Sequence, residues 1–245
     1  MDIGAATDVG RVRAGNEDAL LVLHPQGARK GQVVVAVADG MGGHKAGEVA
    51  SALAVDALRH AVEESDADAT ADSLLAHAAQ LGNETIWSAA AEDAEKEGMG
   101  TTLVAALVEV DGRVVIANVG DSRAYAYVNG ETVLVTEDHT WVNQQVMSGQ
   151  MSQREARFSP FRNLLTRTLG NSPRVDVVVF AGLQLETGDA LILVSDGVTG
   201  YLNESDFSEV LQETEAAQAA AERLVKEAVN RGGADNATAV VVRRR

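Results

Sequence analysis

The chain is 245 residues long, with 46% hydrophobic and 23% charged residues and no cysteine. This composition describes a globular protein with a sizeable core, and it excludes disulfides, thiolate metal sites and a cysteine nucleophile. The 36 acidic residues exceed the 20 basic ones, and the formal charge of −16 repels nucleic acid and anionic membranes. The sequence has neither a signal-peptide pattern nor an apolar stretch of membrane-spanning length. We therefore expect a cytoplasmic protein that binds neither nucleic acid nor membrane.

Up to residue 95 the pattern predicts strands followed by two helices. Residues 5–23 predict two strands joined by a polar turn. The valine-rich run at 33–38 predicts a strand that is buried on both faces and stops at Asp39-Gly40. After a glycine-rich turn, apolar residues at helical spacing predict one helix around 49–62 and an alanine-rich one from Asp72 to about Glu95.

The middle of the chain predicts successive antiparallel strands and then a polar insertion. The expected strands, separated by tight turns that include Asn129-Gly130, are 103–108, 114–119, 124–128 and 132–135. Residues 138–172 break this pattern, because they are polar, rich in glutamine and without a sustained apolar stripe. We expect short surface helices here that form a mobile flap over about 140–165.

The remaining third predicts a return to regular structure. Strands are expected at 175–180 and 190–194, helices at 205–211 and 215–229, and a final strand at 237–242. Antiparallel strands with paired helices before and after them indicate an α+β sandwich. Only three prolines and no linker-like tract are present, so we expect one domain spanning residues 1–245.

Three aspartates stand at the ends of expected buried strands. Asp39 and Asp196 each follow an apolar run and precede a glycine, and Asp235 directly precedes the last strand. A single Asp-Gly pair usually makes only a turn. Three carboxylates at strand ends, however, are costly to desolvate without a shared counter-charge, and a metal ion is the simplest one. Since all candidate ligands are oxygen donors, the pattern favours Mg²⁺ or Mn²⁺, held either as one structural ion or as a catalytic pair.

The glycine-rich turn after Asp39 does not match a nucleotide-binding loop. Residues 40–47 lack the Gly-Lys-Ser/Thr of a Walker loop, and Lys45 stands where a dinucleotide loop requires glycine. We therefore expect the glycine to let the Gly40 backbone carbonyl reach an ion.

Seven sequence blocks, read in order, resemble the metal-dependent PP2C-type (PPM) serine/threonine phosphatases, and in particular their short bacterial branch. In chain order the blocks are Thr7–Asp18, Val37–His44, Met99–Thr102, Val119–Arg123, Asp138–Trp141, Ser195–Gly197 and Gly232–Asn236. The resemblance spans essentially the whole chain. It implies a β-sandwich of two antiparallel sheets flanked by pairs of helices, with metal ions in a cleft at one end.

The resemblance also implies roles for individual residues. Asp39 would bridge two metal ions. The Gly40 carbonyl would bind one of these ions, and Asp196 and Asp235 would bind the other. Glu17 and Asp18 hold metal-bound waters, Asp121 helps to bind a third, weaker ion, and Arg13 binds the substrate phosphate. The implied reaction is hydrolysis of phosphoserine and phosphothreonine in phosphoproteins by water activated at a binuclear Mn²⁺ or Mg²⁺ centre, in opposition to a bacterial serine/threonine kinase.

One departure from the family leaves the general acid open. Met41 stands where eukaryotic members carry a histidine that protonates the leaving group. His44 and His139 are possible substitutes, each equally well explained as a structural or surface residue, and a metal-bound water is the other possibility. Two alternative functions also stay open: a phosphatase dedicated to one regulatory phosphoprotein of the anti-sigma-antagonist type, and a catalytically dead module that binds phosphoproteins.

Overall fold

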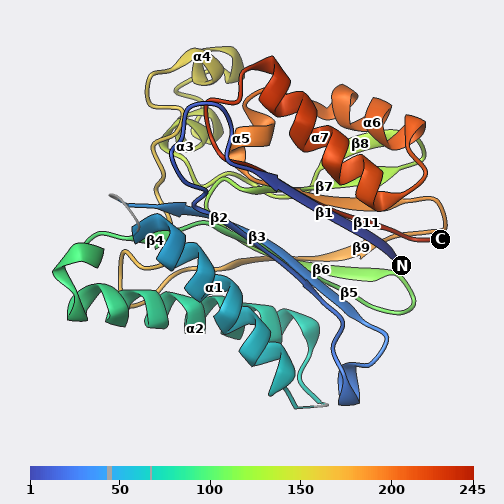
Figure 1. The fold of residues 1–245 in the computed structure, drawn as a ribbon, viewed down its shortest axis with the longest axis horizontal. Coiled ribbons are helices and arrows are strands. Elements are labelled where there is room, and N and C mark those ends of the chain that lie inside the picture. Colours follow the sequence, from blue (N-terminus) through green and yellow to red (C-terminus); the bar gives the residue numbers. More distant parts are fainter. Residues whose placement is uncertain (43–45, 67) are drawn as a thin grey trace.

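Two antiparallel sheets packed face to face form the centre of the molecule, and helices cover their outer faces (Figure 1). The structure is a computed structural model that describes residues 1–42, 46–66 and 68–245. The predicted α+β sandwich is therefore confirmed.

Chain order and spatial order differ in both sheets. One sheet runs in the order β1 (Asp2–Asp8), β11 (Ala237–Arg243), β10 (Ala190–Val194), β7 (Arg123–Val128) and β8 (Glu131–Leu134). The other runs β2 (Asp18–Leu23), β3 (Val33–Met41), β5 (Leu103–Val108), β6 (Arg113–Val119) and β9 (Val178–Gln184), with the short β4 (Gly100–Thr101) paired to the end of β3. Because β1 and β11 are neighbours, residues from both ends of the chain come together in one sheet.

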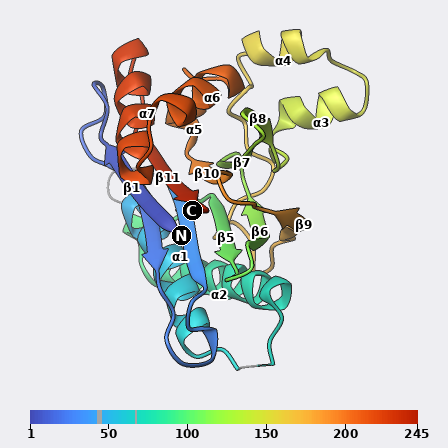
Figure 2. The same ribbon diagram turned by 90° about the vertical axis from the view of Figure 1, so that its right-hand side faces the viewer.

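A pair of long helices covers each outer face. α1 (Ala46–Glu63) and α2 (Ala71–Glu92) lie on the β3 sheet, whereas α6 (Glu204–Glu213) and α7 (Ala217–Arg231) lie on the β11 sheet beside the short α5 (Asp196–Thr199) (Figures 1 and 2). Two short 3₁₀ turns occupy Gly27–Arg29 and Ala94–Lys96. No helix in the described ranges is long and apolar enough to cross a membrane.

Burial of β3 explains its valine-rich sequence. Every residue from 33 to 38 is buried. Val35 and Val37 point into the layer between the sheets, and Val34 and Ala36 point into the layer under α1 and α2. A third apolar layer joins the β11 sheet to α6 and α7. A strand buried on both faces loses the usual polar alternation, as the sequence indicated.

Several predicted boundaries differ from the structure by a few residues, and strand pairing explains two of these differences. β3 does not stop at Asp39 but continues to Met41, because its last residues pair with β4. β9 begins at Val178 rather than at 175, because Val175 and Val177 pack against the α1–α2 layer instead of pairing with β6. A register shift opposite Val114 and Val115 accommodates the extra residue of β9.

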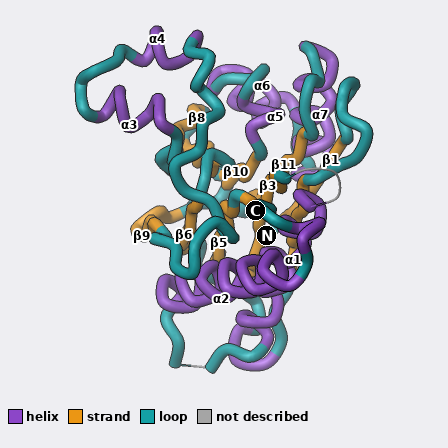
Figure 3. The backbone as a smooth tube through the Cα atoms, turned by 90° about the vertical axis from the view of Figure 1, so that its left-hand side faces the viewer, coloured by secondary structure: helices purple, strands orange, loops and turns teal. Residues whose placement is uncertain are grey.

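The segment 140–165, hereafter the flap segment, extends away from the sandwich. It contains α3 (Trp141–Met147) and α4 (Gln153–Phe158), which project from the body in Figures 2 and 3. None of its residues belongs to the three apolar layers of the described chain. Met147 is 69% exposed and Phe158 is 77% exposed, so apolar side chains of the flap segment face solvent.

Candidate metal centre

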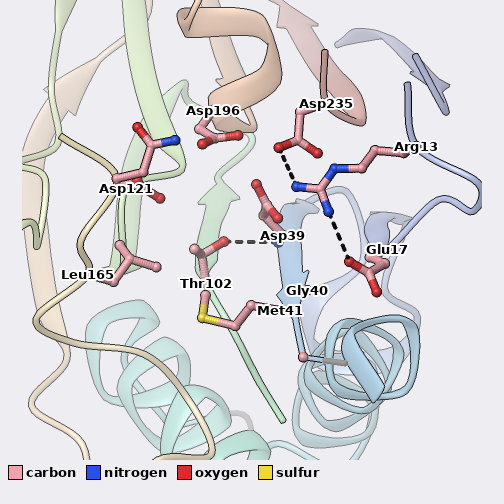
Figure 4. Close-up of a pocket in the computed structure, with 12 residues that line it drawn as sticks. Arg13, Glu17, Asp39, Gly40, Met41, Thr102, Asp121, Leu165, Asp196 and Asp235 are labelled. Atoms are coloured by element: carbon pink, nitrogen blue, oxygen red, sulfur yellow. Dashed lines mark hydrogen bonds and ion pairs between the residues drawn. The ribbon is translucent and has the colours of Figure 1, made fainter. Parts of the chain in front are cut away.

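A pocket of about 240 Å³ opens at one end of the sandwich, where β3, β10 and the loop before β11 converge. Its wall comes from segments far apart in the sequence (Figure 4). The lining residues are Arg13, Glu17, Asp39, Gly40, Met41, Gly42, Thr102, Asp121, Asn163, Leu165, Asp196 and Asp235. The fold thus brings together Asp39, Asp121, Asp196 and Asp235, as the sequence predicted, with Arg13 and Glu17 on the same wall.

The backbone of Asp39 is fixed from the neighbouring strand. Its N–H donates to the Oγ1 atom of Thr102 at 2.9 Å (Figure 4), and its carbonyl accepts from the Thr102 N–H at 2.9 Å. The Thr101 hydroxyl donates to the same carbonyl at 2.9 Å. Because these bonds hold both backbone groups, the carboxylate of Asp39 projects into the pocket from a rigid base.

The two glycines that follow the aspartates permit close approach of another backbone. A Cβ atom at Gly40 would overlap the carbonyl of Gly47 at the start of α1, and one at Gly197 would overlap the carbonyl of Asn236. The Asp-Gly pairs are therefore not simple turns. Gly197 lets the start of α5 lie against the segment that carries Asp235, which places Asp196 and Asp235 side by side.

Asp18 lies behind Asp39 rather than in the pocket wall. The two residues are paired across β2 and β3. One carboxylate oxygen of Asp18 accepts from the Ser195 hydroxyl at 2.8 Å and from the Thr238 hydroxyl at 2.6 Å. The other oxygen, Oδ1, is buried and has no hydrogen-bond partner within the described part of the chain. A buried carboxylate oxygen without a donor is costly, so this atom suits a cation or an ordered water.

Mutual repulsion and burial raise the pKa values of the aspartate cluster. Burial, followed by the charges of Asp18 and Asp196, raises the pKa of Asp39 well above its ordinary value. Burial and the charge of Asp196 raise the pKa of Asp121 to about 7. Burial and the charge of Asp235 likewise raise the pKa of Asp196, although a hydrogen bond with Asp39 opposes this. The cluster is therefore short of positive charge.

Arg13 is the cation of the pocket. Its guanidinium donates to Asp235 Oδ2 at 2.7 Å and lies 3.8 Å from Glu17 Oε2 (Figure 4). The side chain is 47% exposed, so the guanidinium remains accessible from solvent although its two terminal nitrogens are directed at Asp235 and Glu17. A partly exposed guanidinium beside a pocket is suited to hold a phosphate with two parallel hydrogen bonds.

The donor set fits hard divalent cations. Every titratable group in the wall apart from Arg13 is a carboxylate, and the remaining oxygen donors are the Thr102 hydroxyl, the Asn163 amide oxygen and backbone carbonyls. In the described ranges, no three acidic or histidine side chains enclose a ready-made cage. Asp235 accepts a hydrogen bond from Arg13. To bind an ion with the same oxygen, its carboxylate would have to give up this hydrogen bond. The raised pKa values and the unpartnered oxygen of Asp18 agree with such a need for cations.

Comparison with known proteins identifies the family. Residues 11–231 match the family model described as "Protein phosphatase 2C". The chain belongs to the protein phosphatase 2C family.

Relatives within the PP2C family resemble this chain over nearly its whole length. A "Serine/threonine phosphatase stp" of Listeria monocytogenes is 39% identical over 97% of this chain and 94% of its own length. The solved serine/threonine phosphatase of S. agalactiae superposes with a TM-score of 0.92 at 32% identity, covering 100% of this chain and 99% of that one. The catalytic domain of PstP, solved in complex with two manganese ions, gives a TM-score of 0.81 at 35% identity over 98% of this chain and 96% of that one. The chain is thus a bacterial PP2C-type serine/threonine phosphatase, and PP2C phosphatases are metal-dependent enzymes.

No histidine of the described chain lines the pocket of this PP2C phosphatase. Met41 lines the pocket wall directly after Gly40, and a thioether cannot donate a proton. His44 lies outside the described residues. His139 does not reach the pocket wall, and burial together with Arg167 lowers its pKa to about 4. This ring is neutral at physiological pH and is a poor proton donor, so it does not fit the role of general acid.

Sequence reasoning missed the polar residues that hold the PP2C site together. Asn236 follows Asp235 and is 3% exposed. Its amide donates to the carbonyls of Val9 and Gly15 at 2.9 Å each, and its Oδ1 accepts from the Glu17 N–H at 2.8 Å. It therefore ties both ends of the Arg13 loop to the segment that carries Asp235. The sequence signal was present, because an asparagine next to an aspartate at a strand start has the donors and acceptor for such a clamp.

Proposed function

We propose that this PP2C phosphatase hydrolyses phosphoserine and phosphothreonine in phosphoproteins at a centre of two Mn²⁺ or Mg²⁺ ions, with a weaker third ion. The observation that carries the proposal is the juxtaposition of four pocket aspartates with a single, partly exposed arginine. A cluster of acids alone would repel a phosphate dianion, so it can serve phosphate chemistry only when cations invert the local field.

The residues that would hold the ions are those with oxygen atoms on the pocket wall. Asp39 would lie between the two main ions, with the Gly40 carbonyl on one side and Asp196 and Asp235 on the other. Asp121, on the opposite wall, would serve the third ion. When bound, such ions supply counter-charge to the phosphate oxygens and lower the pKa of water so that it attacks phosphorus.

The chain's own side chains would bind and orient the substrate. Arg13 would hold two phosphate oxygens through its guanidinium and so align phosphorus with the carboxylate cluster. Glu17, 18% exposed and 3.8 Å from Arg13, would keep the guanidinium in place and accept hydrogen bonds from water in the mouth of the pocket. Asp18 would orient water from behind Asp39 through its free Oδ1 atom. Water would protonate the leaving alkoxide, since Met41 in the wall has no proton to give and His139 does not line the pocket.

The flap segment would bind the peptide that surrounds the phosphorylated residue. Asn163 and Leu165 of this segment line the pocket. The flap segment carries three arginines against one glutamate in a chain of formal charge −16. Exposed apolar side chains such as Phe158 accompany this local positive charge. The substrates would be proteins phosphorylated by a serine/threonine kinase of the same cell, and the flap segment would be a mobile part of one catalytic domain spanning 1–245.

Metal removal combined with one conservative substitution tests the proposed function. Purified protein is stripped with a chelator and assayed on an aryl phosphate and on a phosphothreonine peptide, before and after Mn²⁺ is added back. We expect turnover to need the metal and Asp196→Asn to lose at least about a hundredfold in kcat, because a ligand carboxylate is removed. Asp56→Asn, on the exposed face of α1 and outside the pocket, is the matched control and should keep wild-type turnover. Full activity after exhaustive metal removal would rule out the two-metal mechanism.

A further inference from the structure

The two ends of the flap segment meet beside the turn that carries Asp121. Thr140 and Leu165 form an isolated antiparallel bridge. The Trp141 N–H donates to the Leu164 carbonyl at 2.8 Å, and the Thr166 N–H donates to the His139 carbonyl at 2.8 Å. The flap segment therefore stands on a narrow two-stranded base, and a residue that fixes one strand of the base fixes the other.

His139 joins this base to Gly120. The His139 N–H donates to the Gly120 carbonyl at 3.0 Å, and the Gly120 N–H donates to the His139 Nδ1 atom at 3.0 Å. A single residue thus satisfies both backbone groups of a buried glycine. Gly120 has a φ of +103°, and a Cβ there would contact Thr102 at 2.6 Å, so the turn has little freedom to find other partners. Asp121, the next residue, enters the pocket from this turn.

The hydrogen bond from Gly120 fixes the tautomer of the His139 ring. An Nδ1 atom that accepts a hydrogen bond carries no proton, so the neutral ring carries its proton on Nε2. Arg167 Nη1 lies 3.2 Å from Nε2, but a guanidinium has only donors. The ring therefore cannot accept from Gly120 and Arg167 at once. Because the Gly120 N–H is buried whereas Arg167 is partly exposed, we expect the Gly120 bond to persist and the Arg167 contact to yield.

We propose that His139 is a positioning residue that, through its Nδ1 atom, locks the Gly120–Asp121 turn to the base of the flap segment. This proposal rests on the proposed function, since it concerns the presentation of Asp121 to the same pocket. It gives the flap segment a mechanical connection to the wall that would hold the third ion. A displacement of the flap base then moves Asp121, and disorder in the Asp121 turn loosens the flap base.

Two isosteric substitutions separate the two ring nitrogens. The amide of His139→Asn can place an oxygen near the position of Nδ1, whereas that of His139→Gln reaches the position of Nε2. In the metal-free protein we expect His139→Asn to keep wild-type hydrogen-exchange protection in peptides covering 118–124 and 164–169. His139→Gln should lose about tenfold in protection there, because the Gly120 N–H loses its acceptor. Arg167→Ala is the control for the Nε2 side and should leave the exchange of 118–124 unchanged.

Kinetics of the same variants add a second measurement. With Mn²⁺, His139→Gln should lose about tenfold in kcat on an aryl phosphate with little change in KM, and His139→Asn should stay within about threefold of wild type. Equal losses in the Asn and Gln variants, or unchanged exchange in both, would overturn the proposal. If the wild type shows no phosphatase turnover, the proposed function fails, yet the exchange contrast still tests the role of His139.

Determining the tautomer of the His139 imidazole in the wild-type protein tests the proposal even if the variants fail to fold. ¹⁵N spectra of the wild-type protein report which imidazole nitrogen carries the proton. We expect His139 to be the Nε2–H tautomer, with Nδ1 hydrogen-bonded to the Gly120 amide. A ring that is protonated at Nδ1 would contradict the proposal, since it could not accept from Gly120.

Discussion

At the scale of single residues, the clustered carboxylates of the pocket lower the stability of the metal-free protein. Burial and mutual repulsion raise the pKa values of Asp39, Asp121 and Asp196, because these carboxylates face one another in a small pocket without cations. Stable proteins seldom bury unpaired like charges, so such a cluster indicates a binding or catalytic site. Substitutions in the cluster should therefore affect activity and metal-free stability in opposite directions.

Asp39→Asn tests this opposition. We expect the variant to lose at least about a hundredfold in turnover with Mn²⁺, because the removed charge is the one proposed to lie between two ions. In the presence of chelator at pH 8 its melting temperature should rise above that of the wild type, by about 2–4 °C for each kcal/mol of relieved repulsion. Activity assays and calorimetry in chelator measure the two effects. A variant that loses both activity and metal-free stability would show that Asp39 has a packing role instead.

Arg13 should contribute mainly to substrate binding. Its partly exposed guanidinium can contact phosphate in the ground state as well as in the transition state, so Arg13→Ala should raise KM more than it lowers kcat. Loss of charge-assisted hydrogen bonds predicts a rise of roughly tenfold to a hundredfold.

Arg11→Ala is the matched control for the Arg13 substitution. Arg11 belongs to the same loop, but its side chain donates to Asn230 at 3.0 Å and does not line the pocket. Steady-state kinetics on a phosphopeptide should leave this control near wild type. A fall in kcat with constant KM in Arg13→Ala would instead assign the guanidinium to the transition state.

At the scale of elements, hydrophobic periodicity predicted most helices and strands, but tertiary pairing decided their ends. The buried run 33–38 was recognised as a strand because all its residues are apolar. The extension of β3 to Met41 depends on pairing with β4, a two-residue strand too short for a sequence pattern. The four-residue α5, which begins at Asp196, is also too short for a sequence pattern to reveal. Both lie next to the pocket, where function rather than local propensity selects the residues.

The flap segment contributes no residue to the three apolar layers, and we predict that it selects substrates. Met147 is 69% exposed on α3, and Met151 follows in the connection to α4. Flexible thioether side chains adapt to varied peptides. Replacing both methionines with alanine should lower kcat/KM on a phosphopeptide by roughly tenfold and leave an aryl phosphate within about twofold.

The edge strand β8 offers a matched control for the flap experiment. Val133 on β8 is 52% exposed and lies outside the pocket and the flap segment, so Val133→Ala should affect neither substrate. Rates for both substrates, with circular dichroism to check folding, complete the comparison. Equal losses on the peptide and on the aryl phosphate would show that the flap segment is structural.

At the scale of the whole molecule, the sequence predicted which aspartates lie together in the pocket, but it did not predict the hydrogen bonds that hold the surrounding segments in place. Asp39, Asp196 and Asp235 were placed together because each stands at a strand end, and the fold confirms that they share a pocket. The clamp by Asn236 and the bond from Gly120 to His139 join segments that are distant in the chain. Such contacts depend on the order of strands in each sheet, and local hydrophobic periodicity does not predict that order.

The net effect of the cluster on stability should appear as an unusual pH dependence. Asp121 has a pKa of about 7 in the folded protein against 3.8 ordinarily, and the pKa values of Asp18, Asp39 and Asp196 are also raised. Between these pH values the folded state binds more protons than the unfolded chain. The metal-free protein should therefore lose stability as pH rises from about 4 to about 7.

His139 opposes this trend but cannot reverse it. Its pKa falls from 6.5 to about 4 on folding, so in the same range the unfolded chain binds one extra proton. Because one histidine is set against four carboxylates, the folded state still binds more protons, and the metal-free protein still loses stability as pH rises.

Added Mn²⁺ should reverse this dependence of stability on pH, because cations bind the ionised carboxylates and stabilise the folded state more as pH rises. Thermal unfolding in chelator and in Mn²⁺ at pH 5, 6, 7 and 8 measures both slopes. A metal-free melting temperature that rises across this range would show that Asp18, Asp39, Asp121 and Asp196 do not bind more protons in the folded state than in the unfolded chain.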